Sequence, residues 1–396
     1  MSKAYDRVEW DFLEAMMCKM GFSDIWVHGL MRCVRTVSYG VMVNGIVSES
    51  FTPSRGLRQG DSLSPYIFLI CGEGLSSLIR SASVTGMLQG ARIGRSAPLV
   101  SHLLFADDSL IFSNATADSA TYLKNLLSTY AGCSGQLVNY DKSHAFFSSN
   151  VTQQDRVEVC NVLQVTEECS PERYLGLPAV VGRNKRRAFK YLLDQVDSKT
   201  NGLGSRILSQ GGKEILIKSI LQSIPLFVMS CFLLSGVFCK EMEAKIARYW
   251  WQHSQLKKGV HWCTWAELSK LKEDDGLGFR DMGKFNIALL AKQGWRLVQD
   301  PGSLVGRLLR AKYFPGSSFL KFGLGSSQSL IWRSIWSARG LLEKRIRLVH
   351  WLRDISVGVE RLLVTGAPSK KSGICSIQSD LPGFRFNPSR GSSLEY

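Results

Sequence analysis

The chain lacks the cysteine patterns of zinc-binding and secreted proteins. Its ten cysteines are scattered, no two are spaced as Cys-x-x-Cys, and no Cys/His set has zinc spacing. The first fourteen residues are charged throughout, so they lack the apolar core of a secretory signal. These absences exclude a zinc module and a disulfide-stapled secreted domain. We therefore expect an intracellular protein with reduced thiols.

Long uncharged runs are nearly absent as well. Ser219 to Cys239 has 21 residues without a charge, which is long enough to span a membrane. It contains Gln222, Pro225, Gly236 and four serines, which favour a buried helix followed by a loop. A membrane-anchored basic protein stays as an alternative, but we expect no membrane partner.

Acidic residues are scarce in one half of the chain. The net charge is +16, yet residues 1–150 hold 12 Lys+Arg and 12 Asp+Glu and are neutral. The other 37 basic and 21 acidic residues follow position 150 and carry the whole excess. A basic half beside a neutral half indicates a polyanionic partner, most simply nucleic acid. The alternative is a basic, solvated surface without a partner. At 45% hydrophobic, the chain can bury the core of two or three domains.

Local patterns predict the first elements. Asp6, followed three residues later by Glu9, predicts a capping box at the start of a helix that Gly21 ends. Asn44-Gly45 between apolar residues predicts a β-hairpin with a type I′ turn.

Further along the chain, Ser64-Pro65 predicts another helix start, since proline suits the first helical position. Two short strands are expected at 103–105 and 110–112, followed by a helix over 116–133.

Two adjacent carboxylates lie between these strands, in Phe105-Ala106-Asp107-Asp108. A hairpin tip would present Asp107 and Asp108 together, and hard cations such as Mg²⁺ prefer oxygen ligands of this kind. Two such ions can activate a primer hydroxyl and neutralise a leaving pyrophosphate. The alternative is ordinary turn chemistry, for which Asp-Asp is also well suited.

A glycine-bearing loop precedes the predicted helix at Ser64. It reads Arg55-Gly-Leu-Arg-Gln-Gly-Asp61 and includes Arg58, Gln59 and Gly60. Glycine lets a backbone approach a ligand closely, and arginines suit phosphate groups. An ordinary strand-to-helix loop is the alternative.

The order of these segments resembles plant LINE-type (non-LTR) retrotransposon reverse transcriptases over about residues 1–350. The segments that carry the resemblance are Lys3-Ala-Tyr-Asp6, Arg58-Gln-Gly-Asp61, Phe105-Ala-Asp-Asp108 and Tyr174-Leu-Gly-Leu-Pro178. The resemblance implies an α+β fold, with part of a right-hand polymerase palm, a helical basic thumb and a helical Trp-rich C-terminal region.

The same resemblance implies roles for single residues. Asp107 and Asp108 would be the metal-binding, catalytic carboxylates, with Mg²⁺ or Mn²⁺ as the cofactor of an active enzyme. Tyr5, Arg58, Gln59, Gly60 and Lys142 would contact nucleotide or template. Tyr174, Leu175 and Gly176 would form the primer grip. A solvated lysine at 142 and a packed tyrosine at 174 remain the alternatives.

The chain departs from the family pattern at two places. Ser62 stands where the family has proline, which frees the loop slightly. The family's first metal-binding aspartate would lie just before Met1, with the fingers region and an endonuclease further upstream. Removing one preorganised group from an active site costs roughly 10²–10³ in rate. The sequence therefore predicts impaired catalysis and a less stable region 1–150, in which the hairpin has an unpaired edge.

The basic half contains a dense cluster after the Tyr174 segment, made of Arg183, Lys185, Arg186, Arg187 and Lys190. Such a cluster can follow a phosphate backbone without reading sequence, although a solvated helix face would look the same. Lys213 and Lys218 begin the long apolar segment, as expected of a thumb helix along a duplex. Eight of the ten tryptophans fall between Trp250 and Trp351, and we favour core packing over base stacking for them.

Together these patterns predict four regions and two alternative functions. The regions are a partial palm over 1–180, a thumb-like region over 181–250, a Trp-rich linker over 251–350 and a disordered tail over 351–396. The first hypothesis is a reverse transcriptase (RNA-directed DNA polymerase) fragment whose partners are an RNA template, a DNA primer and deoxynucleotides. The alternative is a non-catalytic protein that binds nucleic acid. Copying at a target site would require the nucleus, although no clear basic import signal is present.

Overall fold

A computed structural model describes residues 1, 3–94, 96–167, 173–178, 181–182, 184–202, 208–252, 259–325 and 328–344. The chain divides into two compact units, 1–343 and 344–396. We call residues 1–167 the N-terminal segment and residues 185–344 the helical segment, and each is described by itself. Arg183 and the tail predicted over 351–396 lie outside the described residues.

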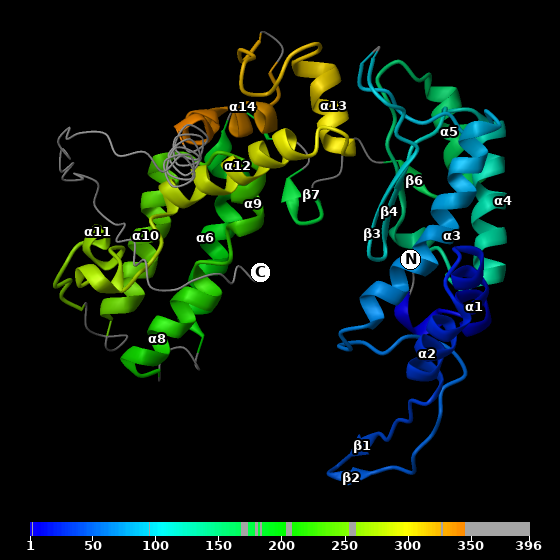
Figure 1. The fold of residues 1–396 in the computed structure, drawn as a ribbon, viewed down its shortest axis with the longest axis horizontal. Coiled ribbons are helices and arrows are strands. Elements are labelled where there is room, and N and C mark those ends of the chain that lie inside the picture. The colour runs from blue at the N-terminus through cyan, green and yellow to red at the C-terminus, as the bar shows by residue number, and fades with distance from the viewer. Residues whose placement is uncertain are drawn as a thin grey trace, which may run out of the picture. The chain divides into compact units, whose positions relative to one another are not determined.

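The N-terminal segment combines helices with short strand pairs, as an α+β fold requires (Figure 1). Its elements are η1 (Tyr5–Arg7), α1 (Trp10–Lys19), α2 (Asp24–Arg35), β1 (Met42–Val43), β2 (Ile46–Val47), α3 (Ser64–Val84), β3 (His102–Phe105), β4 (Asp108–Ile111), α4 (Ala117–Ser134), η2 (Tyr140–Lys142), β5 (His144–Ala145), α5 (Gln153–Leu163) and β6 (Thr166–Glu167).

Helix α3 is the centre of this segment, because α1, α4 and β3 all contact it. Cys71, Leu75 and Ile79 on α3 are fully buried, and apolar clusters lie around both halves of the helix. Gly74 permits the close approach of α1: a Cβ there would lie 2.8 Å from the ring of Phe12. Pro65 stands in the first turn of α3, which confirms the predicted helix start.

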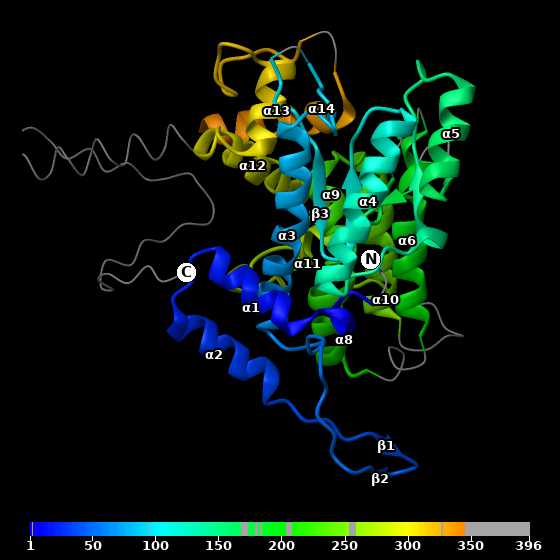
Figure 2. The same ribbon diagram turned by 90° about the vertical axis from the view of Figure 1, so that its right-hand side faces the viewer.

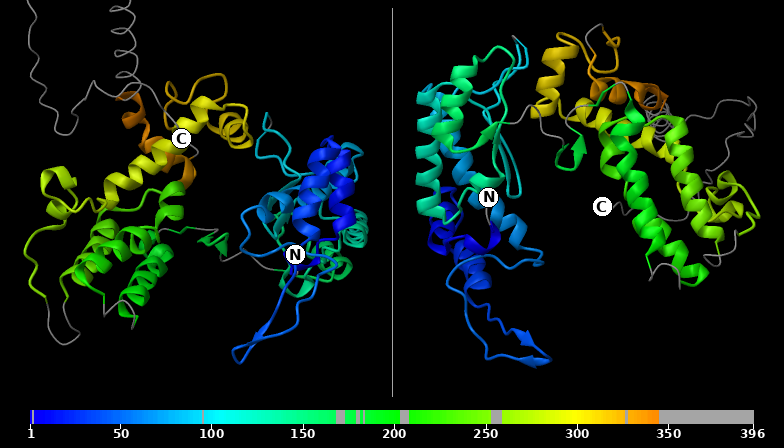
Figure 3. Two further views of the ribbon diagram at one scale, coloured as in Figure 1. Left: turned by 60° about the horizontal axis from the view of Figure 1, so that its bottom comes forward. Right: turned by 180° about the vertical axis from the view of Figure 1, so that it is seen from behind.

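The predicted β-hairpin forms with two left-handed turn residues. Asn44 and Gly45 have φ values of 51° and 82°, and Val43 pairs with Ile46. This hairpin projects away from the helices, with all four strand residues exposed (Figure 3).

The helical segment follows a third hairpin formed by β7 (Arg173–Tyr174) and β8 (Leu177–Pro178). Its elements are α6 (Lys185–Asn201), α8 (Gln210–Leu216), the π-helix η3 (Ile217–Leu221), α9 (Leu226–Cys231), α10 (Gly236–Trp251), α11 (Trp265–Leu268), η4 (Lys272–Asp274), α12 (Met282–Gln299), α13 (Leu304–Tyr313) and α14 (Leu330–Ser337).

A continuous apolar core runs through α6, α9, α10 and the start of α12. Buried Asn286 on α12 joins these elements: its amide donates to the carbonyls of Met229 and Phe232 and accepts from the N–H of Leu234. Trp332 on α14 is also buried and stacks on Tyr313 of α13, so α12, α13 and α14 form a packed group (Figure 2).

One local prediction is corrected by the fold. Asp6 does not cap a helix, because it lies within η1 and α1 begins at Trp10 without a side-chain cap. Residues 219–239, predicted as a buried helix followed by a loop, are divided among η3, α9 and the start of α10. Among the described residues, the helix long and apolar enough to cross a membrane is α3, and such a test is also passed by core helices.

Candidate active site and nucleic-acid interface

The predicted Asp-Asp hairpin forms, with Asp107 in its turn and Asp108 at the start of β4. Phe105 pairs with Asp108, so Ala106 and Asp107 make a two-residue turn. Ala106 has a φ of 49°, a conformation that residues with a Cβ rarely adopt. Both carboxylates are exposed. The strained turn therefore presents two adjacent acids to solvent, as a cation-binding tip requires.

The chain's N-terminal amine lies directly beside this turn. It donates to the backbone carbonyl of Asp107 at 2.7 Å. A cavity of about 370 Å³ opens next to it, lined by residues that include Met1, Ala106 and Gln136. Gln136 is buried, and its side-chain Oε1 has no hydrogen-bond partner among the residues that the structure describes. The flank of the hairpin is thus an open, partly polar space.

The stretch that carries Tyr5 is held between two glycines. Gly56 donates to the carbonyl of Val8, and a Cβ on Gly56 would lie 2.9 Å from the carbonyl oxygen of Asp6. On the other side, a Cβ on Gly135 would lie 2.2 Å from the carbonyl oxygen of Arg7. Both glycines have positive φ, so no other residue would fit easily at either place.

This clamp brings the first two predicted motifs together. Gln59 donates to the Asp6 carboxylate at 3.2 Å, and the N–H of Leu57 donates to the carbonyl of Tyr5 at 2.7 Å. The ring of Tyr5 stacks on Phe68 of α3, with centroids 4.9 Å apart. Asp6 therefore links the two motifs instead of capping a helix.

The other predicted nucleotide contacts are exposed. Gly60 has a φ of 85°, and a Cβ there would meet nothing within 4 Å, so the tip of its loop is open. Arg58 and Lys142 are also exposed, and among the described residues neither makes an ion pair. Their roles remain predictions.

The Tyr174 motif forms a hairpin of its own. Leu175 and Gly176 are its turn residues, with φ values of 51° and 77°. Burial raises the pKa of Tyr174, and the negative charge of Asp108 adds to the rise. The Tyr191 hydroxyl donates to the carbonyl of Gly176 at 3.1 Å, which ties the hairpin to α6. A hairpin is confirmed, while its role as a primer grip remains a prediction.

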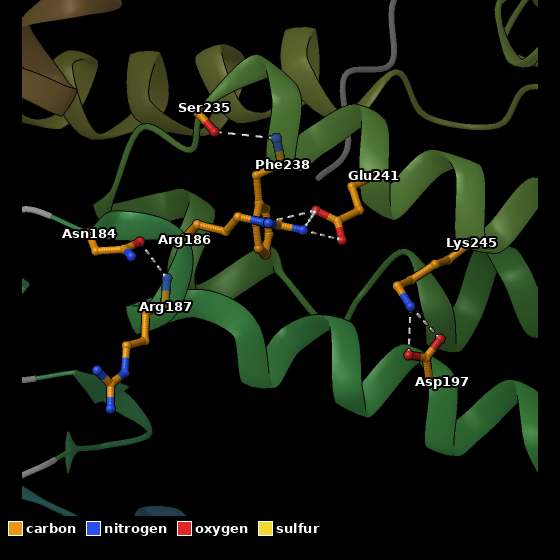
Figure 4. A network of polar contacts seen from close by, with 8 residues as sticks. All are labelled: Asn184, Arg186, Arg187, Asp197, Ser235, Phe238, Glu241 and Lys245. Carbon is orange, nitrogen blue, oxygen red and sulfur yellow. Dashed lines mark hydrogen bonds and ion pairs between the residues drawn. The ribbon is translucent and has the colours of Figure 1, made fainter.

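The basic residues on α6 differ in whether they form an ion pair (Figure 4). Arg186 forms a bidentate ion pair with Glu241 of α10, which raises the pKa of the guanidinium. Lys245 of α10 pairs with Asp197 of α6 in the same way. Arg186 therefore connects α6 to α10, and its role at a phosphate backbone remains a prediction.

Three other cations of the cluster are available. The side chains of Lys185, Arg187 and Lys190 are exposed and, among the described residues, have no acidic partner. In Figure 4 the Arg187 side chain points away from the Glu241 pair. These three remain candidates for a phosphate backbone.

The position of Lys213 corrects the expectation that this lysine lies along a duplex. Its ammonium group is buried and donates to the backbone carbonyl of Gln252 at 2.5 Å, and burial lowers its pKa. Lys218 pairs with Glu214 one turn away. Neither lysine is placed as a free contact to a duplex.

The residues of the hairpin fit a divalent cation in their chemistry. Asp107 and Asp108 supply oxygen ligands, and Mg²⁺ is commonly held by one or two carboxylates together with water and substrate phosphates. Among the described residues, no group of three His, Cys, Asp or Glu side chains could hold a metal ion. Among the described residues, the carboxylates available at this tip are those of the two aspartates.

Comparisons with known proteins identify the family of the chain. The family profile described as reverse transcriptase (RNA-dependent DNA polymerase) matches residues 1–192. An uncharacterized mitochondrial protein of Arabidopsis thaliana is 44% identical over 138 residues, which are 35% of this chain and 86% of that protein. A putative ribonuclease H protein of Arabidopsis thaliana is 30% identical over 162 residues, 41% of this chain and 25% of that protein.

A more distant relative is the retrovirus-related Pol polyprotein of a type-2 retrotransposable element of Drosophila melanogaster. It is 27% identical over 196 residues, 48% of this chain and 16% of the polyprotein. The chain belongs to the reverse transcriptase family. Its relatives include plant proteins and a retrotransposon polyprotein, in agreement with the resemblance to plant LINE-type reverse transcriptases. It spans a quarter or less of the two longer relatives.

Proposed function

We propose that residues 1–192 form the portion of an RNA-directed DNA polymerase that holds the catalytic metal ions and the incoming nucleotide. The observation that supports this most directly is the β3–β4 hairpin, which presents Asp107 and Asp108 side by side at an exposed, strained turn. In this proposal the partners are an RNA template, a DNA primer and deoxynucleotides.

The surroundings of several predicted residues support the proposal. Asp107 and Asp108 would hold Mg²⁺ or Mn²⁺, which when bound supplies charge neutralisation at the transferred phosphate. Tyr5 is fixed by stacking on Phe68, so its ring can serve as a rigid surface beneath a sugar. Gln59, held by Asp6, and the open tip at Gly60 can lie against the nucleotide or template.

A metal-binding measurement tests the first step. Mn²⁺ can be titrated into the full chain and the free ion followed by electron paramagnetic resonance. The double variant Asp107→Asn/Asp108→Asn should weaken binding at least about tenfold, because even outer-shell partners of metal ligands contribute 10–100-fold. Asp24→Asn is the matched control, since Asp24 is exposed on α2, away from the hairpin. Equal loss in both variants would contradict the proposal.

A second candidate function is binding of nucleic acid without catalysis. It is favoured by the absence, among the described residues, of a third acidic ligand near the two aspartates. The same variants separate the two functions. If Asp107→Asn/Asp108→Asn lowers Mn²⁺ affinity, and lowers whatever templated primer extension the impaired wild-type chain retains, the polymerase function stands. If the double variant leaves Mn²⁺ binding unchanged while binding of an RNA–DNA hybrid persists, the function of binding nucleic acid without catalysis stands.

A further inference from the structure

The last three helices of the described chain carry an unusual charge balance. Residues 282–343 contain nine Lys+Arg and two Asp+Glu, whereas residues 185–281 contain 16 and 10. This stretch lies outside residues 1–192, so the family match assigns it nothing. Its positive charge is therefore a property that the proposed polymerase site does not explain.

Ion pairs hold several cations before this stretch, but few within it. Glu214 pairs with both Lys218 and Lys272, while Glu241 and Asp197 hold Arg186 and Lys245. In 282–343, Lys284 pairs with Asp281 and Arg339 pairs with Glu343. In the described chain, seven other cations there have no acidic partner and are exposed: Lys292, Arg296, Arg307, Arg310, Lys312, Lys321 and Arg333.

The helix dipole explains the positions of some of these seven cations and does not explain the positions of others. Arg296 stands in the last turn of α12, and Arg310 and Lys312 stand in the last turn of α13, where a cation complements the helix dipole. Lys292 and Arg307 stand before the last turn, so the dipole gives no reason for either. Both are exposed and have no acidic partner among the described residues, and their helices contact each other, so the two cations suit a chain of phosphates.

An exposed aromatic ring lies on the same face as Lys292. Trp295 and Arg296 follow Lys292 by three and four residues, which places all three on one face of α12. Gly294 is on the opposite face, where a Cβ would meet Phe319 and Leu342. The Lys292 face is therefore the one turned away from the packed group.

Trp295 also differs from the tryptophans that pack in this group. Trp332 and Trp336 each donate a hydrogen bond to a backbone carbonyl, and Trp332 stacks on Tyr313. Trp295 is 38% exposed and, within the described ranges, has neither a ring partner nor a hydrogen bond. An exposed indole among cations is the combination that binds unpaired bases.

We infer that this face of α12, together with Arg307 of α13, binds single-stranded nucleic acid. Phosphates would lie against Lys292 and Arg307, and a base would stack on Trp295. This surface goes beyond the proposed polymerase function, because none of its residues belongs to the candidate active site. RNA and DNA share this chemistry, so the experiment compares the two.

The test measures fluorescence anisotropy of labelled oligo(U) and oligo(dT), each about 20 nucleotides long so that it exceeds one binding site, over a range of KCl concentrations. Lys292→Gln/Arg307→Gln in the full chain should lower the salt slope by about 1.4, since each phosphate contact on a single strand contributes about 0.7. The matched control is Lys270→Gln/Lys284→Gln, which removes the same charge from two lysines paired with acids. An unchanged slope in the first variant, or an equal fall in the control, overturns the inference.

A second variant tests the stacking separately. Trp295→Leu keeps an apolar side chain. It should weaken the binding of both oligonucleotides about fivefold or more, because stacking contributes about 1–3 kcal/mol per base. Binding of a fully paired duplex should hardly change. Equal weakening for single strands and duplex would refute stacking. Mn²⁺ titration of the same variants should match the wild type, so failure here is distinguishable from failure of the Asp107–Asp108 site.

Discussion

The N-terminal segment and the helical segment differ in how completely they cover their apolar residues. In the helical segment a continuous core joins α6, α9, α10 and the start of α12. The bulkiest fully buried side chain of this segment, that of Trp332, lies outside that core and packs against aromatic rings of its own group. In the N-terminal segment the apolar residues fall into separate clusters around α3. Exposed apolar side chains also remain on the β1–β2 hairpin, where Ile46 is 75% exposed.

The candidate catalytic residues and the more continuous apolar core therefore lie in different segments. The residues that the family resemblance singles out for catalysis lie in the N-terminal segment, on turns with positive φ and beside an open cavity. The helical segment has the more continuous core, and it carries excess positive charge. Active sites commonly keep strained, incompletely packed elements, and the surrounding structure has to hold them. Here Gly56 and Gly135 hold the backbone of the stretch that carries Tyr5.

The largest expected effect tests whether the packing around Trp332 is local to its own helices. Trp332→Ala should cost about 3–5 kcal/mol, because it empties a fully buried site between Tyr313 and Phe314. Hydrogen exchange should rise in α12, α13 and α14 and stay unchanged in α1, α3 and α4. Trp262→Ala is the control: Trp262 is 79% exposed, so its loss should change stability by about 0.5 kcal/mol or less. An equal rise in hydrogen exchange in α3 of Trp332→Ala would show that the packing around Trp332 is not local to its own helices.

A smaller effect tests the glycine clamp in the N-terminal segment. Gly21→Ala places a Cβ in the left-handed region in open space and should cost about 1–2 kcal/mol. Gly135→Ala adds to a similar strain a contact of 2.2 Å with the carbonyl oxygen of Arg7. It should cost about 1–3 kcal/mol more, as overpacked sites do. Urea denaturation of the two variants measures the difference, and equal losses would show that Arg7 moves aside freely.

Features decided by neighbouring residues were predictable from the sequence. Asn44-Gly45 formed its hairpin, Ser64-Pro65 began α3, and Gly21 followed the end of α1, because turn and cap chemistry depends on a few adjacent residues. The ordered motifs likewise identified the Asp107–Asp108 hairpin.

Features decided by distant contacts were not predictable. Asp6 matches a capping box, yet Gln59 lies against its carboxylate, and Gln136 donates to the carbonyl of Ala4 from 132 residues away. Arg186 belongs to a basic run, yet Glu241 pairs with it from 55 residues away. A single sequence shows the charge of each residue but not which partner the fold will bring to it.

The smallest expected effect concerns pH, and it sharpens the difference between the two segments. His102 lines the cavity beside the Asp107 hairpin. Its two ring nitrogens lie 2.8 Å from the Ser76 hydroxyl and 2.9 Å from the Ser101 hydroxyl. Burial lowers the pKa of His102 below 6.5, and the positive charge of Arg80 lowers it further, against an opposing effect of Glu73.

The fold therefore favours the neutral imidazole, and the unfolded chain binds the proton more readily. This contribution to stability is complete above pH 6.5 and is lost as the pH falls from there towards the lower pKa of the folded state. Thermal unfolding at several pH values should show that His102→Gln loses less stability on acidification than the wild type. His28→Gln, a change at an exposed histidine of α2, should behave like the wild type. Hydrogen exchange at the lower pH should locate the loss in α3 and β3, with the helical segment unaffected. A pH-independent gap between wild type and His102→Gln would mean that the histidine contributes only through its two hydroxyl contacts.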